Sequence, residues 1–141
     1  MKLVYLYVEN PVAGVIGRNL NFSSRYDIHM DKKLEDGGRM EFYLQLSKKP
    51  FYDDIIYGKN VEVFGIVGEN GTGKSSVLDY IRRLHYDCEN FANEIGFAFS
   101  IWEKDGEFIL FKNPFLDKVV LINLRDIDSG EEICLTNREC I

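Results

Sequence analysis

The sequence predicts an α/β fold that is rich in strands and contains one strong helix. Three observations predict it: a glycine-rich motif over residues 68–75, an apolar strand pattern directly before the motif, and an amphipathic helix pattern directly after it. Residues 1–60 show mostly strand patterns, so the fold does not begin with the strand–helix alternation of a nucleotide kinase or small GTPase. With 141 residues, the chain has room for one domain with a sizeable core.

The motif has the G-x-x-x-x-G-K-[ST] spacing of a phosphate-binding P-loop. Its glycines permit the backbone angles that turn successive N–H groups toward phosphate oxygens, and the following helix adds the positive end of its dipole. We expect Lys74 to contact the outer phosphates as the catalytic lysine and the Ser75 hydroxyl to bind Mg²⁺, with ATP as the nucleotide. The residues expected to bind ATP are Gly68, Glu69, Asn70, Gly71, Thr72, Gly73, Lys74, Ser75 and Ser76.

The segments on either side of the motif agree with it. Residues 61–67 are apolar and β-branched except for one glutamate and one glycine, which is typical of a P-loop strand. A helix is predicted to begin at Lys74. The pattern predicts one apolar helix face formed by Val77, Leu78, Ile81 and Leu84, with Asp79, Arg82 and Arg83 on the solvated side.

Strand patterns fill most of the remaining chain. The first nine residues are apolar on both faces, as in a sheet interior. Residues 26–30 and 40–46 alternate around an Asp-Gly-Gly turn and predict a hairpin with one wet face. Residues 97–102 and 107–111 predict a second hairpin, residues 118–124 predict a buried strand, and the tail from Asp126 has no pattern.

Composition restricts the class of protein. Hydrophobic residues make up 45% of the chain, which excludes a mainly disordered protein, and no apolar run is long enough to span a membrane. The net charge of −6 provides no basic footprint for nucleic acid. Three cysteines without a C-x-x-C pair predict a reducing, cytoplasmic setting and no zinc site.

Three segments together resemble a known family: residues 2–10, residues 21–23 (Asn-Phe-Ser), and residues 64–78 with the wording G-E-N-G-T-G-K-S-S. They are similar to the N-terminal part of ABC-type ATPases of the SMC/RecF-like group, close to bacterial "AAA family ATPase" proteins of defence and overcoming-lysogenization-defect type. In that family an arginine often follows the asparagine of the first strand. Here Asn10 is followed by Pro11, Val12 and Ala13, which departs from the pattern.

The resemblance implies that residues 1–141 are the N-terminal portion of an incomplete ATPase head. Such a head has an antiparallel β subdomain beside a mixed sheet that bears the P-loop strand and helix. Two heads dimerise around ATP, and each supplies a signature loop to the nucleotide of the other. The implied partners are the remainder of the ATPase or a second head, as a homodimer, and a nuclease or another effector in a bacterial defence or DNA-maintenance system.

The residues that complete a hydrolytic site have no clear counterpart. A Walker B strand ends in acidic residues, whereas residues 119–122 are followed by Asn123, and Asp126 comes three residues late. Ser129-Gly130-Glu131 resembles the core of the family's signature loop but lacks the preceding Leu-Ser. We therefore expect this chain to bind ATP and to hydrolyse it slowly or not at all. A non-hydrolysing nucleotide sensor or scaffold and a small P-loop kinase remain the alternatives.

Overall fold

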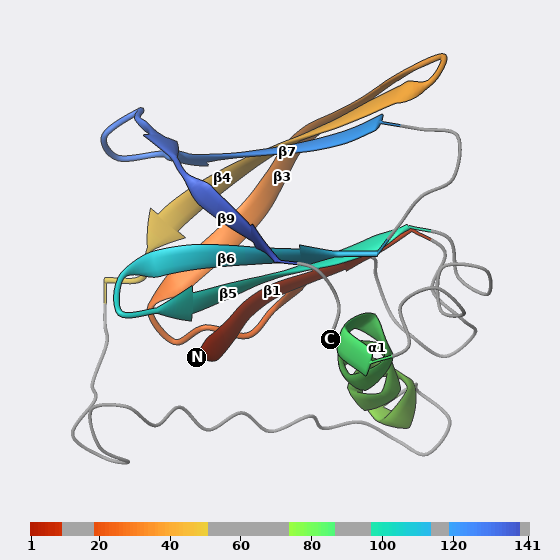
Figure 1. Ribbon diagram of the computed structural model, residues 1–141. Helices are drawn as coiled ribbons and strands as arrows, with labels where there is room; N and C mark the ends of the chain where they lie inside the picture. The colour runs from red at the N-terminus through yellow and green to blue at the C-terminus, as the bar shows by residue number, and fades with distance from the viewer. Residues whose placement is uncertain (10–18, 51–73, 87–96, 114–118, 139–141) are drawn as a thin grey trace.

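The computed structural model describes residues 1–9, 19–50, 74–86, 97–113 and 119–138 (Figure 1). The elements within these ranges are β1 (Lys2–Val8), β2 (Asn19–Asn21), β3 (Tyr26–Asp36), β4 (Arg39–Lys48), α1 (Lys74–Tyr86), β5 (Ala98–Lys104), β6 (Glu107–Lys112), β7 (Val119–Asp126), β8 (Glu132–Ile133) and β9 (Leu135–Arg138). The described part of the chain is therefore rich in strands and contains one helix, as predicted.

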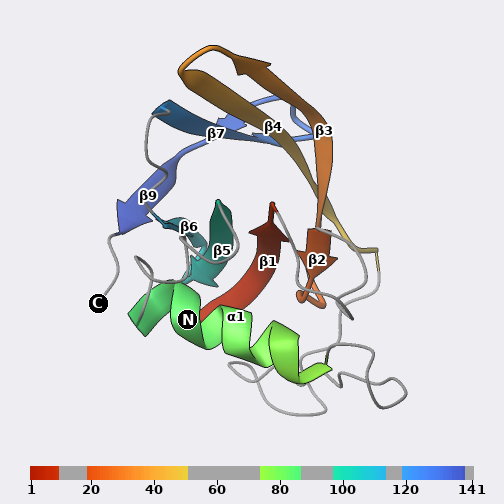
Figure 2. The same cartoon turned by 90° about the vertical axis from the view of Figure 1, so that its right-hand side faces the viewer.

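The strands form two sheets that face each other. One sheet has five strands in the order β2-β1-β5-β6-β9, and the other has four in the order β3-β4-β7-β8. Most neighbours are antiparallel, but β4 pairs with β7 and β6 pairs with β9 in parallel. Figure 2 shows the four-stranded sheet on one side of the five-stranded sheet and α1 on the other side, so that the described elements lie in three layers.

Within the described ranges, the chain passes directly from one sheet to the other at two corners. At one corner, the Asn21 side chain pairs with the backbone of Ile28: its Nδ2 donates to the Ile28 carbonyl at 2.9 Å, and its Oδ1 accepts from the Ile28 N–H at 2.8 Å. An asparagine amide offers the same donor and acceptor as a peptide group, so it takes the place of a strand partner here. At the other corner, Cys134 separates β8 in one sheet from β9 in the other.

Aromatic rings fill the space between the sheets. Tyr7 and Phe99 come from the five-stranded sheet and Phe42 from the four-stranded sheet; their ring centroids lie 5.0 to 5.3 Å apart. Phe42 and Phe99 are fully buried, and Tyr7 is 2% exposed. Aromatic pairs at these separations stabilise a fold by about 0.5–1.5 kcal/mol each beyond their buried area. The ring contacts therefore hold the two sheets together.

One end of the interface between the sheets is closed by a charged contact. The Glu9 carboxylate, directly after β1, accepts hydrogen bonds from the Tyr7 hydroxyl and from Lys33 Nζ of β3. Lys33 lies on the inner side of β3 because a β-bulge between Met30 and Lys32 shifts the register there. A partly buried pair of this kind limits sliding of one sheet over the other, since both partners lose hydrogen bonds if it separates.

The predicted strands at residues 1–9 and the two predicted hairpins are confirmed. β1 is buried from Val4 to Val8 because α1 covers one of its faces and the four-stranded sheet covers the other. In β4, alternate residues are at most 2% exposed, and the residues between them are partly exposed, so this hairpin does have one wet face. The inward residues of β4 are Met40, Phe42, Leu44 and Leu46.

Two predictions about the C-terminal third are wrong. The strand at residues 119–126 is only half buried: Val120 and Leu124 point into the core, whereas Val119 is 62% and Leu121 38% exposed. The tail is not unpatterned, because it forms β8 and β9. The β9 strand pairs in parallel with β6, and such a long-range partner leaves no local periodic signal in four residues.

The aromatic contact between the sheets yields a stability prediction. We expect Phe42→Ala to lower the free energy of unfolding by about 3–5 kcal/mol, because it removes a fully buried ring and leaves a cavity against Tyr7 and Phe99. Urea denaturation measures the change. Val119→Ala, at an exposed position of β7, serves as the control and should cost less than about 1 kcal/mol. Equal losses in the two variants would contradict the proposed role of the rings.

Candidate functional site

The glycine-rich motif predicted to bind phosphate lies at the edge of the described part of the chain. The predicted strand at 61–67 and the predicted ligands Gly68, Glu69, Asn70, Gly71, Thr72 and Gly73 fall outside the described residues. Lys74, Ser75 and Ser76 are the first three residues of α1. The prediction that a helix begins at the lysine of the motif is confirmed.

The helix is held on the five-stranded sheet by one apolar face. Tyr80 is 3% exposed and Leu84 is fully buried, and both pack on Leu6, Val8 and Ala98 of the sheet. Val77 is also buried, and Ile81 packs against the same cluster. These four helical residues follow i, i+3, i+4 and i+7 spacing.

The predicted apolar face of α1 needs one correction. The sequence pattern predicts Leu78 on the apolar face of the helix. In the structure Leu78 is 59% exposed, and Tyr80 occupies the buried face instead. Successive helical residues are rotated by about 100°, so Leu78 points well away from Val77 and Leu84. The tyrosine ring supplies the apolar body that the prediction assigned to Leu78.

The first turn of α1 is electrostatically suited to an anion. This turn contains no acidic residue, so no side-chain carboxylate competes with a ligand for the positive end of the helix dipole. The first carboxylate along the helix, Asp79, forms an ion pair with Arg82 at 2.7 Å. Arg82 is exposed, which confirms the prediction that it lies on a solvated face.

Two of the segments that resemble the ATPase family meet in one apolar cluster beneath α1. Leu6 and Val8 of β1 and Phe22 after β2 belong to this cluster, together with Tyr80 of α1, which comes two residues after the third segment. In Figure 2, α1 crosses the five-stranded sheet with its first turn on the side of β2. The end of the helix where the motif is expected therefore lies on the same side as residues 21–23.

The acidic residues after β7 build a turn. Asp126 Oδ1 accepts a hydrogen bond from the N–H of Asp128 at 2.9 Å, and the Asp126 carbonyl accepts from Gly130 at 2.8 Å. Ser129 Oγ accepts from the N–H of Glu131, and Gly130 has a φ of 72°, which favours glycine. Figure 1 shows this turn and α1 on opposite sides of the molecule. The resemblance of residues 129–131 to a signature loop is explained by the needs of this turn.

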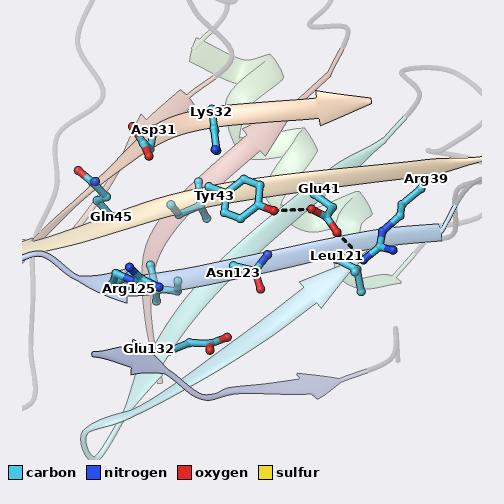
Figure 3. A pocket seen from close by; sticks show the side chains of 12 residues that line it. Asp31, Lys32, Arg39, Glu41, Tyr43, Gln45, Leu121, Asn123, Arg125 and Glu132 are labelled. Atoms are coloured by element: carbon cyan, nitrogen blue, oxygen red, sulfur yellow. Dashed lines mark hydrogen bonds and ion pairs between the residues drawn. The ribbon is translucent and has the colours of Figure 1, made fainter. Parts of the chain in front are cut away.

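A second polar feature, which the sequence did not predict, lies on the outer face of the four-stranded sheet. It is a shallow hollow of about 520 Å³. Figure 3 shows side chains from all four strands around it, among them Lys32, Tyr43, Gln45, Asn123, Arg125 and Glu132. The sequence shows that polar residues alternate with apolar residues along β4. Only the tertiary pairing of β4 with β7 brings the outward side chains of these two strands together.

Hydrogen bonding shifts the pKa values of two residues at the centre of this face. The Tyr43 hydroxyl donates to the Glu41 carboxylate, and this bond lowers the pKa of Glu41, helped by the positive charge of Arg39. The same bond raises the pKa of Tyr43, because the carboxylate favours the protonated phenol. Lys32 Nζ lies 4.9 Å from the centroid of the Tyr43 ring, a cation–π distance.

The described residues contain no group of three or more His, Cys, Asp or Glu side chains arranged to hold a metal ion. Within the same residues, α1 is too short and too polar to cross a membrane. The expected Mg²⁺ ligand Ser75 is described only as part of the helix backbone.

The corrected helix face predicts different costs for two leucines of α1. Leu84→Ala should lower the free energy of unfolding by about 2–5 kcal/mol, because Leu84 is fully buried against the sheet. Leu78→Ala should change it by less than about 0.5 kcal/mol, because Leu78 is exposed. Chemical denaturation of both variants measures the difference. If Leu78→Ala were the more costly, the docking of α1 described above would be wrong.

The Tyr43–Glu41 bond predicts a pH effect. In Tyr43→Phe, the pKa of Glu41 should rise toward its ordinary value, because the hydroxyl that stabilises the carboxylate is gone. A lowered folded-state pKa stabilises the protein above the unfolded-state pKa, and this stabilisation is lost as the pH falls through the folded-state pKa. The variant should therefore lose less stability on acidification. Carboxyl NMR titration of Glu41 gives the direct measurement, and an unchanged pKa would contradict the assignment.

Comparison with known proteins gives no assignment: no family model, curated protein or solved structure matches the chain.

Proposed function

We propose that the chain binds ATP with Mg²⁺ through residues 68–76, as the N-terminal portion of an ABC-type ATPase head. One observation supports this proposal most strongly. The G-E-N-G-T-G-K-S-S motif continues directly into α1, whose first residue is the lysine of the motif and whose first turn lacks acidic residues. The N–H groups at such a helix start have no partner within the helix and can bind phosphate oxygens.

Each part of the proposed site has a separate task. The glycines at positions 68, 71 and 73 let the backbone wrap the phosphates, and Lys74 neutralises the outer phosphates. Ser75 supplies one oxygen to Mg²⁺, which takes its other ligands from phosphates and water. The apolar contacts of Tyr80 and Leu84 with the sheet fix the direction of the helix, so that the phosphate-binding end is supported by the fold.

Hydrolysis requires groups beyond the phosphate-binding loop. An acidic residue must position the attacking water, and charge must be stabilised in the transition state. We propose that these groups come from the complete protein and a second head, as in the ATPases that the chain resembles. The whole protein would then hydrolyse ATP in a bacterial defence or DNA-maintenance system, together with a nuclease or another effector.

A non-hydrolysing nucleotide sensor or scaffold is the second candidate. The observation that favours it is the turn after β7, where Asp126 is engaged with Asp128 and Gly130. Asn123 follows the apolar stretch of β7, at the position where a Walker B strand would carry an aspartate. In such a module, ATP would act as a ligand that changes assembly, and turnover would not be needed.

Titration with a fluorescent ATP analogue tests the proposed site. Lys74→Ala should weaken binding roughly tenfold or more, because a hydrogen bond to a charged group is worth about 1.5–3 kcal/mol. Lys104→Ala, which removes an exposed lysine of the β5–β6 hairpin, is the matched control and should bind as the wild type does. Equal binding by wild type and Lys74→Ala would refute the proposed site.

Turnover measured with Mg²⁺ separates the two candidate functions. The chain alone should release little or no phosphate above background, whatever its affinity for ATP. Robust hydrolysis that disappears in Lys74→Ala would show that the catalytic groups are present in this chain. In that case, the chain would not be a non-hydrolysing sensor. The proposal that its catalytic groups come from the complete protein and a second head would be wrong as well.

A further inference from the structure

The outer face of the four-stranded sheet combines exposed apolar side chains with charges of both signs. Leu34 on β3 is 48% exposed, and Leu121 and Val119 on β7 are 38% and 62% exposed, with β4 between these two strands. No helix or strand of the described ranges covers it, whereas α1 covers the outer face of the other sheet (Figure 2). Large apolar side chains grouped in this way are typical of a contact surface.

Strand pairing arranges the side chains of this face in three rows. Residues directly opposite each other in neighbouring strands lie in one row. The first row is Asp36, Arg39 and Val119; the middle row is Leu34, Glu41 and Leu121; the third row is Lys32, Tyr43 and Asn123. The two outer rows each contain a charged residue on β3, and the two charges are opposite in sign.

The one charge in the middle row is already compensated. Glu41 forms an ion pair with Arg39 and accepts the hydroxyl hydrogen bond of Tyr43, as Figure 3 shows. Its side chain is only 17% exposed. A partner that covers the middle row therefore does not need to bring a compensating charge, and the two leucines of that row can form the dry centre of a contact.

We propose that this face binds the same face of a second copy of the chain. The proposed two-fold axis runs along the middle row. It places Leu34 against Leu34 and Leu121 against Leu121, and it exchanges the first row with the third. Glu41 also lies opposite Glu41, and each of these carboxylates keeps its Arg39 ion pair and its Tyr43 hydrogen bond within its own copy. Asp36 of each copy then lies opposite Lys32 of the other.

The same rotation gives the remaining residues of the outer rows suitable partners. Arg39 of one copy lies opposite the Tyr43 ring of the other, a favourable cation–π arrangement. Sheets packed face to face lie about 10 Å apart, which side chains of this size span. An interface of this symmetry must be complementary to itself.

A uniformly basic partner fits this face less well, because Lys32 and Arg39 would repel it. A uniformly acidic partner would be repelled by Asp36. The proposed contact lies on the opposite side of the sandwich from α1, so it does not depend on the nucleotide site and should form without ATP. It is therefore separate from the ATP-dependent association of heads.

Sedimentation velocity over a range of protein concentrations, without nucleotide, tests the proposal. The wild type should dimerise reversibly, with a dissociation constant of roughly tens of micromolar. Asp36→Lys and Lys32→Asp should each weaken the dimer about tenfold or more, because each places like charges opposite one another. The double variant Asp36→Lys, Lys32→Asp should regain most of the affinity, because the pair is restored with the charges exchanged.

Matched leucine variants separate this contact from other surfaces. Leu121→Glu should abolish the dimer, because it replaces an apolar contact at the axis by two further carboxylates that, unlike Glu41, have no arginine paired with them, whereas Leu78→Glu on α1 should leave the dimer unchanged. Urea denaturation of each variant checks that it is folded. A wild type that stays monomeric at all concentrations would overturn the proposal. So would a dimer that survives Leu121→Glu, or charge reversals that the double variant does not rescue.

Discussion

The contact of Tyr7, Phe42 and Phe99 is the interaction on which the rest of the structure depends. It lies within the apolar cluster that joins the two sheets, together with the Tyr26–Phe108 ring pair. Polar links between the sheets add to it: the Asn21 corner, the Glu9–Lys33 contact, and the bond from Lys112 Nζ to the Val120 carbonyl at 3.1 Å. The five-stranded sheet is covered on this side by the four-stranded sheet, and its other face receives α1 through Leu6, Val8 and Ala98.

This layered arrangement gives the two faces of the molecule different chemistry. On the α1 side, apolar residues of β1 and β5 bury the helix, and the helix presents its first turn and the P-loop motif at one end. On the opposite side, the four-stranded sheet exposes rows of mixed charge with leucines between them. The proposed nucleotide site and the proposed contact between copies are therefore separated by the whole thickness of the sandwich.

Sequence patterns predicted those elements whose signal is local. The β3–β4 and β5–β6 hairpins follow from alternation around Gly-containing turns, and the start of α1 follows from the glycine–lysine motif. The errors have two physical sources. Leu78 is hydrophobic, but its angle on the helix turns it away from the buried face, and β9 carries no local signal because its partner β6 is distant in sequence. The P-loop ligands from Gly68 to Gly73 remain predictions from the motif.

By itself, the sequence determined that the chain is rich in strands, that a helix begins at Lys74, and that this helix start follows a glycine-rich motif with P-loop spacing. These properties depend on turn chemistry, side-chain alternation and backbone freedom, which act over a few residues. Only the tertiary structure decided which strands pair, that Asp126 and Gly130 serve a turn, and that Lys32, Glu41 and Leu121 share a face. The physical reason is that strand register and sheet stacking are set by contacts between residues far apart in the chain, and no local pattern specifies them.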